Sequence, residues 1–239
     1  MSKVVTTTVL PRDGFDTLNI GAAGDTVAIA GDSLNTNVLQ DAGGNNIFTS
    51  SSGTVSSTAL QGSLQLLSSQ TASDSASVSF TTQLTSTYDV YMFTFIDINP
   101  ATNDTGFVVN FSSDGGSSYN VTKTTTSFRA SHTESDSSAE LTYAPGNDLA
   151  QSTAYMTIAA SLPNGADEST GGEMYLFAPS STTYVKQFYS RAQSNLGTGA
   201  YDWFRGGYCN TTSAINAVDF KVQSGNFDGI IKLYGISKT

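Results

Sequence analysis

The sequence predicts an all-β protein: an antiparallel, jelly-roll-like β-sandwich preceded by an extended, β-rich N-terminal arm. Apolar residues come in short bursts that alternate with polar ones, as in residues 107–111, and a period near two is typical of strands. Gly, Asn and Asp separate the bursts, as in Asp114-Gly115-Gly116. No stretch carries the sustained 3.6-residue apolar stripe of a capped helix, although residues 147–154 have room for a helical turn.

Residues 1–62 are predicted to form the arm. Their only aromatic residues are Phe15 and Phe48, and Gly, Asn, Asp and Thr are frequent. Short strands are predicted at residues 4–10, 26–30, 33–39 and 46–49, and residues 50–58 read as a flexible linker. Isolated hairpins are marginal in water, so we expect this segment to be stabilised by the same segment of neighbouring chains. A loosely attached arm is the alternative.

Residues 63–239 are predicted to form the sandwich, because the aromatic content rises there and strand signals become regular. A dozen strands joined by short turns fit a β-sandwich of the jelly-roll kind. In chain order, the predicted strands are residues 64–68, 76–82, 88–98, 106–112, 118–129, 140–143, 154–161, 172–178, 184–193, 201–209, 215–223 and 229–236.

Two of these strands are apolar on both faces, whereas a solvated sandwich face would alternate with polar residues. Because no helix is predicted that could cover the second apolar face, we expect a second copy of the chain to cover it. The residues expected to pack between subunits are Tyr91, Phe93, Phe95, Tyr175 and Phe177. We expect a homotrimer, although no residue specifies the number three.

Composition disfavours several partners. The chain has 239 residues, with 20 acidic against 10 basic side chains and a net charge of −10. Such a field repels nucleic acid and anionic membranes. Residues 1–10 lack the apolar segment of a secretion signal, and no apolar run approaches the ~20 residues of a membrane-spanning helix.

The sequence offers little catalytic or metal-binding chemistry. Cys209 is the only cysteine and is predicted to be a small buried apolar group, and His132, the only histidine, is predicted to lie in a loop or at a strand end. The Asp/Gly stretches at 41–46 and 114–116 lack the ligand series of a calcium loop. We therefore expect no enzyme activity, cofactor or metal.

The densest aromatic patch spans residues 201–208. In a strand, Tyr201, Trp203 and Arg205 share one face and Phe204 takes the other. We expect Tyr201, Trp203, Arg205 and Tyr208 to lie in the core or at a subunit interface, with surface recognition as the alternative.

Three segments resemble a module of virion proteins. YDVYMFTFIDINPATNDTGFVVNFSSDGGSSYN (88–120), GGEMYLFAPSSTTYVKQFYSR (171–191) and NTTSAINAVDFKVQSGNFDGIIKLYGI (210–236) are similar to fibre-like virion structural proteins of marine tailed bacteriophages. Residues 24–53 resemble the stem or anchoring segments of such proteins more weakly. The resemblance implies a virion protein with a jelly-roll distal domain, assembled in the host cytoplasm, and it supplies no catalytic residue.

The expected function is a short trimeric tail fibre. Residues 1–62 would attach to other virion proteins, and the sandwich would contact a glycan or protein of the host surface. A capsid decoration or head-fibre protein that binds capsomers is the alternative. A third class is a glycan depolymerase, for which the candidate carboxylates are Asp136, Glu140, Asp167, Glu168 and Asp202.

Overall fold

The structure is a computed structural model of the chain, and it describes residues 38–40, 46–51, 54–56 and 63–237. The chain divides into two compact units, Met1–Leu60 and Gln61–Thr239. In the first unit, the described residues form a small antiparallel sheet of β1 (Val38–Gln40), β2 (Asn46–Ser51) and β3 (Thr54–Ser56).

Strand β3 lies inside the segment predicted as a flexible linker. Its residues pair with the end of β2, with Val55 opposite Ser50, so part of the linker is a hairpin. The strands predicted at residues 4–10 and 26–30 lie outside the described residues, as does most of the strand predicted at 33–39.

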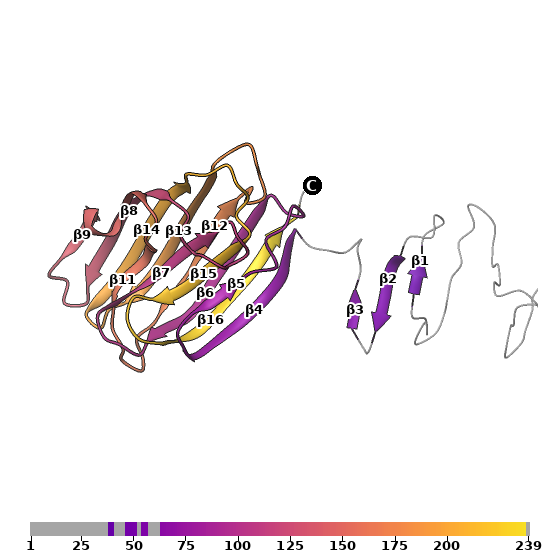
Figure 1. Cartoon of the computed structure of the whole chain (residues 1–239). Coiled ribbons are helices and arrows are strands. Elements are labelled where there is room, and N and C mark those ends of the chain that lie inside the picture. Colours follow the sequence, from indigo (N-terminus) through magenta and orange to yellow (C-terminus); the bar gives the residue numbers. More distant parts are fainter. Residues whose placement is uncertain (1–37, 41–45, 52–53, 57–62, 238–239) are drawn as a thin grey trace, which may run out of the picture. The chain divides into compact units, whose positions relative to one another are not determined.

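The second unit is an antiparallel sandwich of a large and a small sheet (Figure 1). The large sheet has the order β10-β8-β14-β13-β12-β6-β16-β4, and β9 also pairs with β8. Its strands are β4 (Leu64–Ser75), β6 (Val90–Pro100), β8 (Lys123–Thr133), β9 (Ala139–Tyr143), β10 (Leu149–Ser152), β12 (Thr170–Phe177), β13 (Lys186–Asn195), β14 (Gly199–Cys209) and β16 (Phe227–Ile236). The small sheet has the order β11-β7-β15-β5, with β5 (Val78–Phe80), β7 (Thr105–Ser112), β11 (Met156–Leu162) and β15 (Ala217–Val222).

All twelve strands predicted for this unit are present, and the all-β antiparallel sandwich is confirmed. Strand β10 was not predicted, because Leu149–Ser152 is short and has little alternation. The helical turn expected at 147–154 is instead a 3-10 turn at Pro145–Asn147, which ends as β10 is about to begin.

The core lies between the two sheets and is dominated by aromatic rings. Phe220 of β15 lies between rings from both sheets, with centroid distances of 5.1 Å to Phe93, 5.3 Å to Phe95 and 5.9 Å to Phe107. Such pairs stabilise the interior beyond simple area burial, by ~0.5–1.5 kcal/mol each.

The core also takes in three residues that were expected at a subunit interface. Tyr91, Phe93 and Phe95 of β6 are 0%, 0% and 3% exposed and belong to the chain's own hydrophobic core. The Tyr91 hydroxyl donates a hydrogen bond to the carbonyl oxygen of Thr85. These three side chains therefore present no surface to a second copy, because the small sheet already covers this face of β6.

The first and the last residue described in this unit, Ser63 and Ser237, lie side by side. The Ser237 amide donates to the Ser63 carbonyl at 2.8 Å, so the chain enters and leaves at the same end of the large sheet. This places both connections beside β4 and β16, away from the β8–β9 edge.

Candidate functional surface: the outer face of the large sheet

The two outer faces of the sandwich differ in what covers them. On the small sheet, Asn110 is fully buried, and its amide donates to the carbonyls of Tyr119 and Thr153. Asp219 is 4% exposed and accepts hydrogen bonds from Ser79 Oγ (2.5 Å) and Tyr155 Oη (2.9 Å). This face is polar, and the chain's own segments close it.

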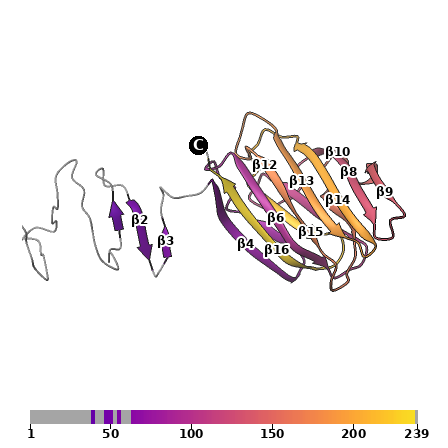
Figure 2. The ribbon, with the colours of Figure 1, turned by 180° about the vertical axis from the view of Figure 1, so that it is seen from behind.

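The outer face of the large sheet is open and apolar. In Figure 2 its strands lie side by side in front, and no segment of residues 63–237 crosses over them. Seven of the eight most exposed large apolar side chains in residues 63–237 lie here, and Tyr184 is the exception. The seven are Leu64, Leu66, Ile96, Phe128, Leu141, Tyr143 and Tyr189.

One end of this face carries a continuous apolar region, which we call the outer patch. Strand register builds it, because side chains on the same face of paired strands are neighbours. One row joins Leu66, Tyr234, Met92, Tyr175 and Tyr189 across five strands. The complete outer patch is Leu64, Leu66, Val90, Met92, Tyr175, Phe177, Tyr189, Tyr234 and Ile236, of which Met92, 9% exposed, is nearly covered by its neighbours.

The aromatic rings of the outer patch stack on one another. Tyr175 and Tyr189 have centroids 5.0 Å apart and planes 26° apart, and Phe177 lies 5.8 Å from Tyr189. These contacts hold the three rings together as one cluster, and the Tyr175 hydroxyl donates to Glu173 Oε2 at 3.3 Å.

The outer patch is also electrically balanced. The charged side chains beside it on this face are Glu173, Arg191, Asp202 and Lys232, two of each sign. Residues 63–237 as a whole contain 15 acidic and 7 basic residues. The outer patch is therefore a neutral region of an acidic domain, where like-charged copies repel each other least.

An aromatic strip continues the face toward the β8–β9 edge. Phe128 and Phe204 stack with centroids 4.7 Å apart, and the Arg191 guanidinium lies 5.2 Å from the centre of the Phe204 ring. Arg191 is fixed in turn by two-pronged hydrogen bonding to Asp202, with Nη2 to Oδ2 at 2.5 Å and Nε to Oδ1 at 3.0 Å. The Asp202 carboxylate also raises the pKa of Arg191, chiefly by accepting these hydrogen bonds.

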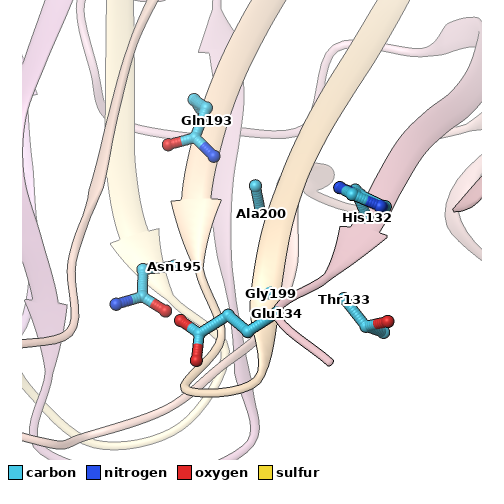
Figure 3. A pocket seen from close by; sticks show the side chains of 7 residues that line it. All are labelled: His132, Thr133, Glu134, Gln193, Asn195, Gly199 and Ala200. Carbon is cyan, nitrogen blue, oxygen red and sulfur yellow. The ribbon is translucent and has the colours of Figure 1, made fainter. Parts of the chain in front are cut away.

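The other end of the face holds a polar depression, which we call the trough. It has a volume of about 380 Å³ and is lined by His132, Thr133, Glu134, Gln193, Asn195, Gly199 and Ala200. Figure 3 shows the Glu134 carboxylate extending in front of Gly199 toward Asn195, while the short Ala200 side chain lies between Gln193 and His132. A second depression of about 270 Å³ shares His132, Gln193 and Ala200 and extends to Asp202.

The backbone holds the trough together. The Glu134 amide donates to the Thr198 carbonyl at 3.0 Å, which ties the β8–β9 turn to the β13–β14 turn. His132 Nε2 lies 3.0 Å from Asp136 Oδ1, and both side chains are largely exposed. Gly199 permits the close approach of β14 to β8, because a Cβ there would overlap the His132 carbonyl oxygen.

The residues predicted in the 201–208 patch divide between the two faces. Trp203 and Arg205 are 1% and 2% exposed and lie inside the sandwich, so they belong to the core and not to a recognition surface. Tyr201 packs partly against the core, and Tyr208 is half-buried on the outer face. The predicted alternation is right, and it is the facing second sheet that buries Trp203 and Arg205.

Arg205 links the two sheets. Its Nε donates to the Thr157 carbonyl of β11 at 2.8 Å, and its Nη1 donates to Ser127 Oγ. Its guanidinium lies 5.1 Å from the centre of the Trp203 ring. Burial, with a smaller effect from the nearby Arg129 charge, lowers the pKa of Arg205 to about 10, so it remains a cation at neutral pH.

The remaining sequence candidates are spread over several turns. Glu168 Oε2 accepts from the Gly165 amide, and Asp202 is engaged by Arg191. Among the described residues, no group of three or more His, Cys, Asp or Glu side chains has the arrangement of a metal site. Within the same residues, no helix is long and apolar enough to cross a membrane.

Sequence reasoning missed the trough and most of the outer patch. Met92, Tyr189, Tyr234 and Leu66 come from four strands, and only their register makes them neighbours. The available signal was polar–apolar alternation in β13, where Tyr189 breaks a run of polar outward residues. Comparisons of the chain with protein-family models, curated proteins and solved structures find no match.

Proposed function

We propose that this chain is a self-associating structural protein of a phage virion, a short trimeric tail fibre with a jelly-roll-like distal domain. The observation that carries the proposal is the outer patch, a neutral apolar surface that residues 63–237 leave uncovered. Exposed apolar surfaces of this extent mark interaction sites in soluble proteins. The resemblance of residues 88–120, 171–191 and 210–236 to virion proteins supplies the biological setting.

In this proposal the copies pack through Tyr175, Phe177 and their neighbours in the outer patch. Residues 1–62 attach the fibre to other virion proteins, and the far end of the sandwich points toward the host surface. Stacked rings, small charge and rigid strands are the properties expected at the centre of a protein–protein interface.

The test compares two lysine substitutions of exposed tyrosines in the full chain. Tyr189 is 45% exposed within the outer patch, and Tyr184 is 72% exposed but lies outside it. Sedimentation velocity and light scattering should show a trimer for the unmodified protein. Tyr189→Lys should weaken association at least tenfold, since burying an unpaired charge costs more than about 1.4 kcal/mol. Tyr184→Lys should leave association unchanged.

A folded monomer at micromolar concentration would overturn the self-association proposal. Equal behaviour of the two lysine variants would instead remove the outer patch as the interface. Circular dichroism of each variant checks that both remain folded.

A capsid decoration or head-fibre protein uses the same self-association and is the second candidate. Antibody labelling of virions in electron micrographs, with a copy-number count, separates the two. A tail fibre predicts label at the tail and tens of copies or fewer, whereas decoration predicts hundreds of copies on the head. Release of sugar from host envelope material would favour the depolymerase instead, with Asp202 and Glu140 among the carboxylates to substitute.

A further inference from the structure

We propose that the trough around Ala200 binds a neutral saccharide. This inference rests on the proposed function and deepens it by naming the class of ligand that the outward-pointing end of the sandwich would hold. It concerns the end of the outer face opposite the outer patch, so both surfaces can be occupied together.

The shape of the trough follows from the strand register. Ala200 of β14 pairs with His132 of β8 on one side and Asn195 of β13 on the other. Because the Ala200 side chain is a single methyl group between the longer side chains of His132 and Asn195, it forms the floor of the trough and they form its walls. The larger depression, about 380 Å³, reaches the lower range of small-molecule sites, which begins near 300 Å³, and the smaller one of about 270 Å³ shares three of its lining residues.

The walls carry planar groups that can both donate and accept hydrogen bonds. Gln193 uses its amide nitrogen toward the Ser194 carbonyl at 3.2 Å, which leaves its amide oxygen as an acceptor. Asn195 uses its amide oxygen to accept from the Gly197 amide at 2.8 Å, which leaves its amide nitrogen as a donor. Side-by-side donors and acceptors match sugar hydroxyls, which donate and accept at once.

The charges select against acidic ligands. Glu134, Asp136 and Asp202 surround the trough, and Arg191, already bound to Asp202, is the fixed cation beside it. A sialic or uronic acid would meet a negative potential, whereas an uncharged sugar loses nothing to it. The trough is also too small and too polar for a protein partner, whose interface buries ~1,200 Å² or more around an apolar centre.

Binding by one trough should be weak, because the site is open to solvent. Several troughs on one assembly would raise the avidity through effective concentration, by a factor of ~10² or more. Such an arrangement suits adhesion to a surface that displays the same sugar many times.

The experiment is saturation-transfer NMR on the full chain with two sets of probes. One set contains neutral oligosaccharides of glucose, galactose, mannose and N-acetylglucosamine. The other contains sialylated and uronic-acid oligosaccharides. We expect saturable binding of at least one neutral probe and at least tenfold weaker binding of the acidic ones.

Matched variants locate the site. Ala200→Phe fills the floor at an exposed strand position where an aromatic residue is tolerated, and should reduce binding at least tenfold. Ala139→Phe makes the same change on β9, in the same row of the sheet but outside the trough, and should bind as the unmodified protein does. Gln193→Ala should weaken binding severalfold by removing one wall amide.

The inference is overturned if no neutral probe binds, if acidic probes bind equally well, or if Ala200→Phe binds like Ala139→Phe. Its failure is separable from that of the fibre proposal. A trimer that binds no neutral sugar removes the trough as a site, whereas a monomer with sugar binding at the trough removes the fibre and keeps the site.

Discussion

At the scale of single residues, the least expected feature is a buried row of Lys123, Cys209 and Lys186. The three lie side by side on the inner face of β8, β14 and β13. Lys123 Nζ donates to the carbonyls of Val121 (2.9 Å) and Ala154 (2.7 Å). Lys186 Nζ donates likewise to Thr211 and Ser213. Carbonyl oxygens thus replace water around both ammonium groups, as buried charges require.

Burial moves the pKa values in this row in opposite directions. Desolvation lowers the pKa of Lys123 to about 8 and raises the pKa of the Cys209 thiol to about 12, despite the two nearby ammonium groups. A raised thiol pKa means that the folded state keeps its proton while the unfolded chain loses it. Cys209 is therefore an unreactive core group, as its position in the sequence predicts.

This difference predicts an alkaline loss of stability that depends on Cys209. As pH rises above the ordinary thiol pKa of 9, the unfolded chain binds fewer protons than the folded one, so the free energy of unfolding falls. Between pH 8 and 10.5 the loss should be about 2 kcal/mol. Urea unfolding at pH 8 and pH 10.5 should show a fall that is smaller by this amount in Cys209→Ala.

Lys123 has the opposite effect on stability. Its pKa is about 8 in the folded state and 10.5 in the unfolded chain, so between these pH values the unfolded chain binds more protons and the free energy of unfolding rises. Burial is the main cause of this shift and is kept in Cys209→Ala, so most of the Lys123 effect cancels when the two proteins are compared. An identical pH dependence in the two would contradict the assignment.

At the scale of elements, β14 organises the large sheet. It pairs over its whole length with both β8 and β13, and it contributes to the core, to the aromatic strip and to the trough. Its N-terminal end depends on Gly199, since a Cβ there would overlap the His132 carbonyl oxygen on β8. A backbone atom cannot swing aside as a flexible side chain can.

Gly199→Ala should therefore force the end of β14 away from β8 and lower the free energy of unfolding by about 1–3 kcal/mol. The matched control is Gly146→Ala, because Gly146 has open space where a Cβ would lie. That change should stay within about 0.5 kcal/mol of the unmodified protein. Chemical denaturation measures both, and a Gly199→Ala protein as stable as the control would refute the close approach.

At the scale of the whole molecule, charge and apolar surface are distributed unequally. The chain carries a net charge of −10, while the outer patch is bordered by two acids and two bases. The proposed self-association through this patch would bring strongly acidic copies together without placing their excess charge at the contact. The long-range repulsion between copies then remains as the main electrostatic effect.

Raising the salt concentration from 20 to 200 mM NaCl should therefore strengthen self-association severalfold, because the repulsion is screened over a Debye length of ~10 Å at 0.1 M. Sedimentation equilibrium at several salt concentrations measures the effect. An assembly held by ion pairs would respond in the opposite way, and weaker association at high salt would argue against the outer patch as the contact.

Particular residues show how far sequence reasoning reached. The alternation in residues 201–208 correctly placed Phe204 opposite Trp203 and Arg205, but it did not say which face was inside. The double apolar character of β6 and β12 correctly predicted apolar residues on both faces of the large sheet, and Tyr175 and Phe177 lie on the outer one. The predicted interface role of Tyr91, Phe93 and Phe95 was wrong. Both faces of β6 are apolar, so its sequence looks the same whichever face of the strand points into the core.

The sequence by itself determined the antiparallel strand class and twelve of the thirteen strands of the sandwich, because these follow from local periodicity and turn residues. The tertiary structure alone decided which face is inside, since that depends on where the second sheet packs. The tertiary structure also places Ala200 between His132 and Asn195, because strand register makes neighbours of residues that are distant in the chain.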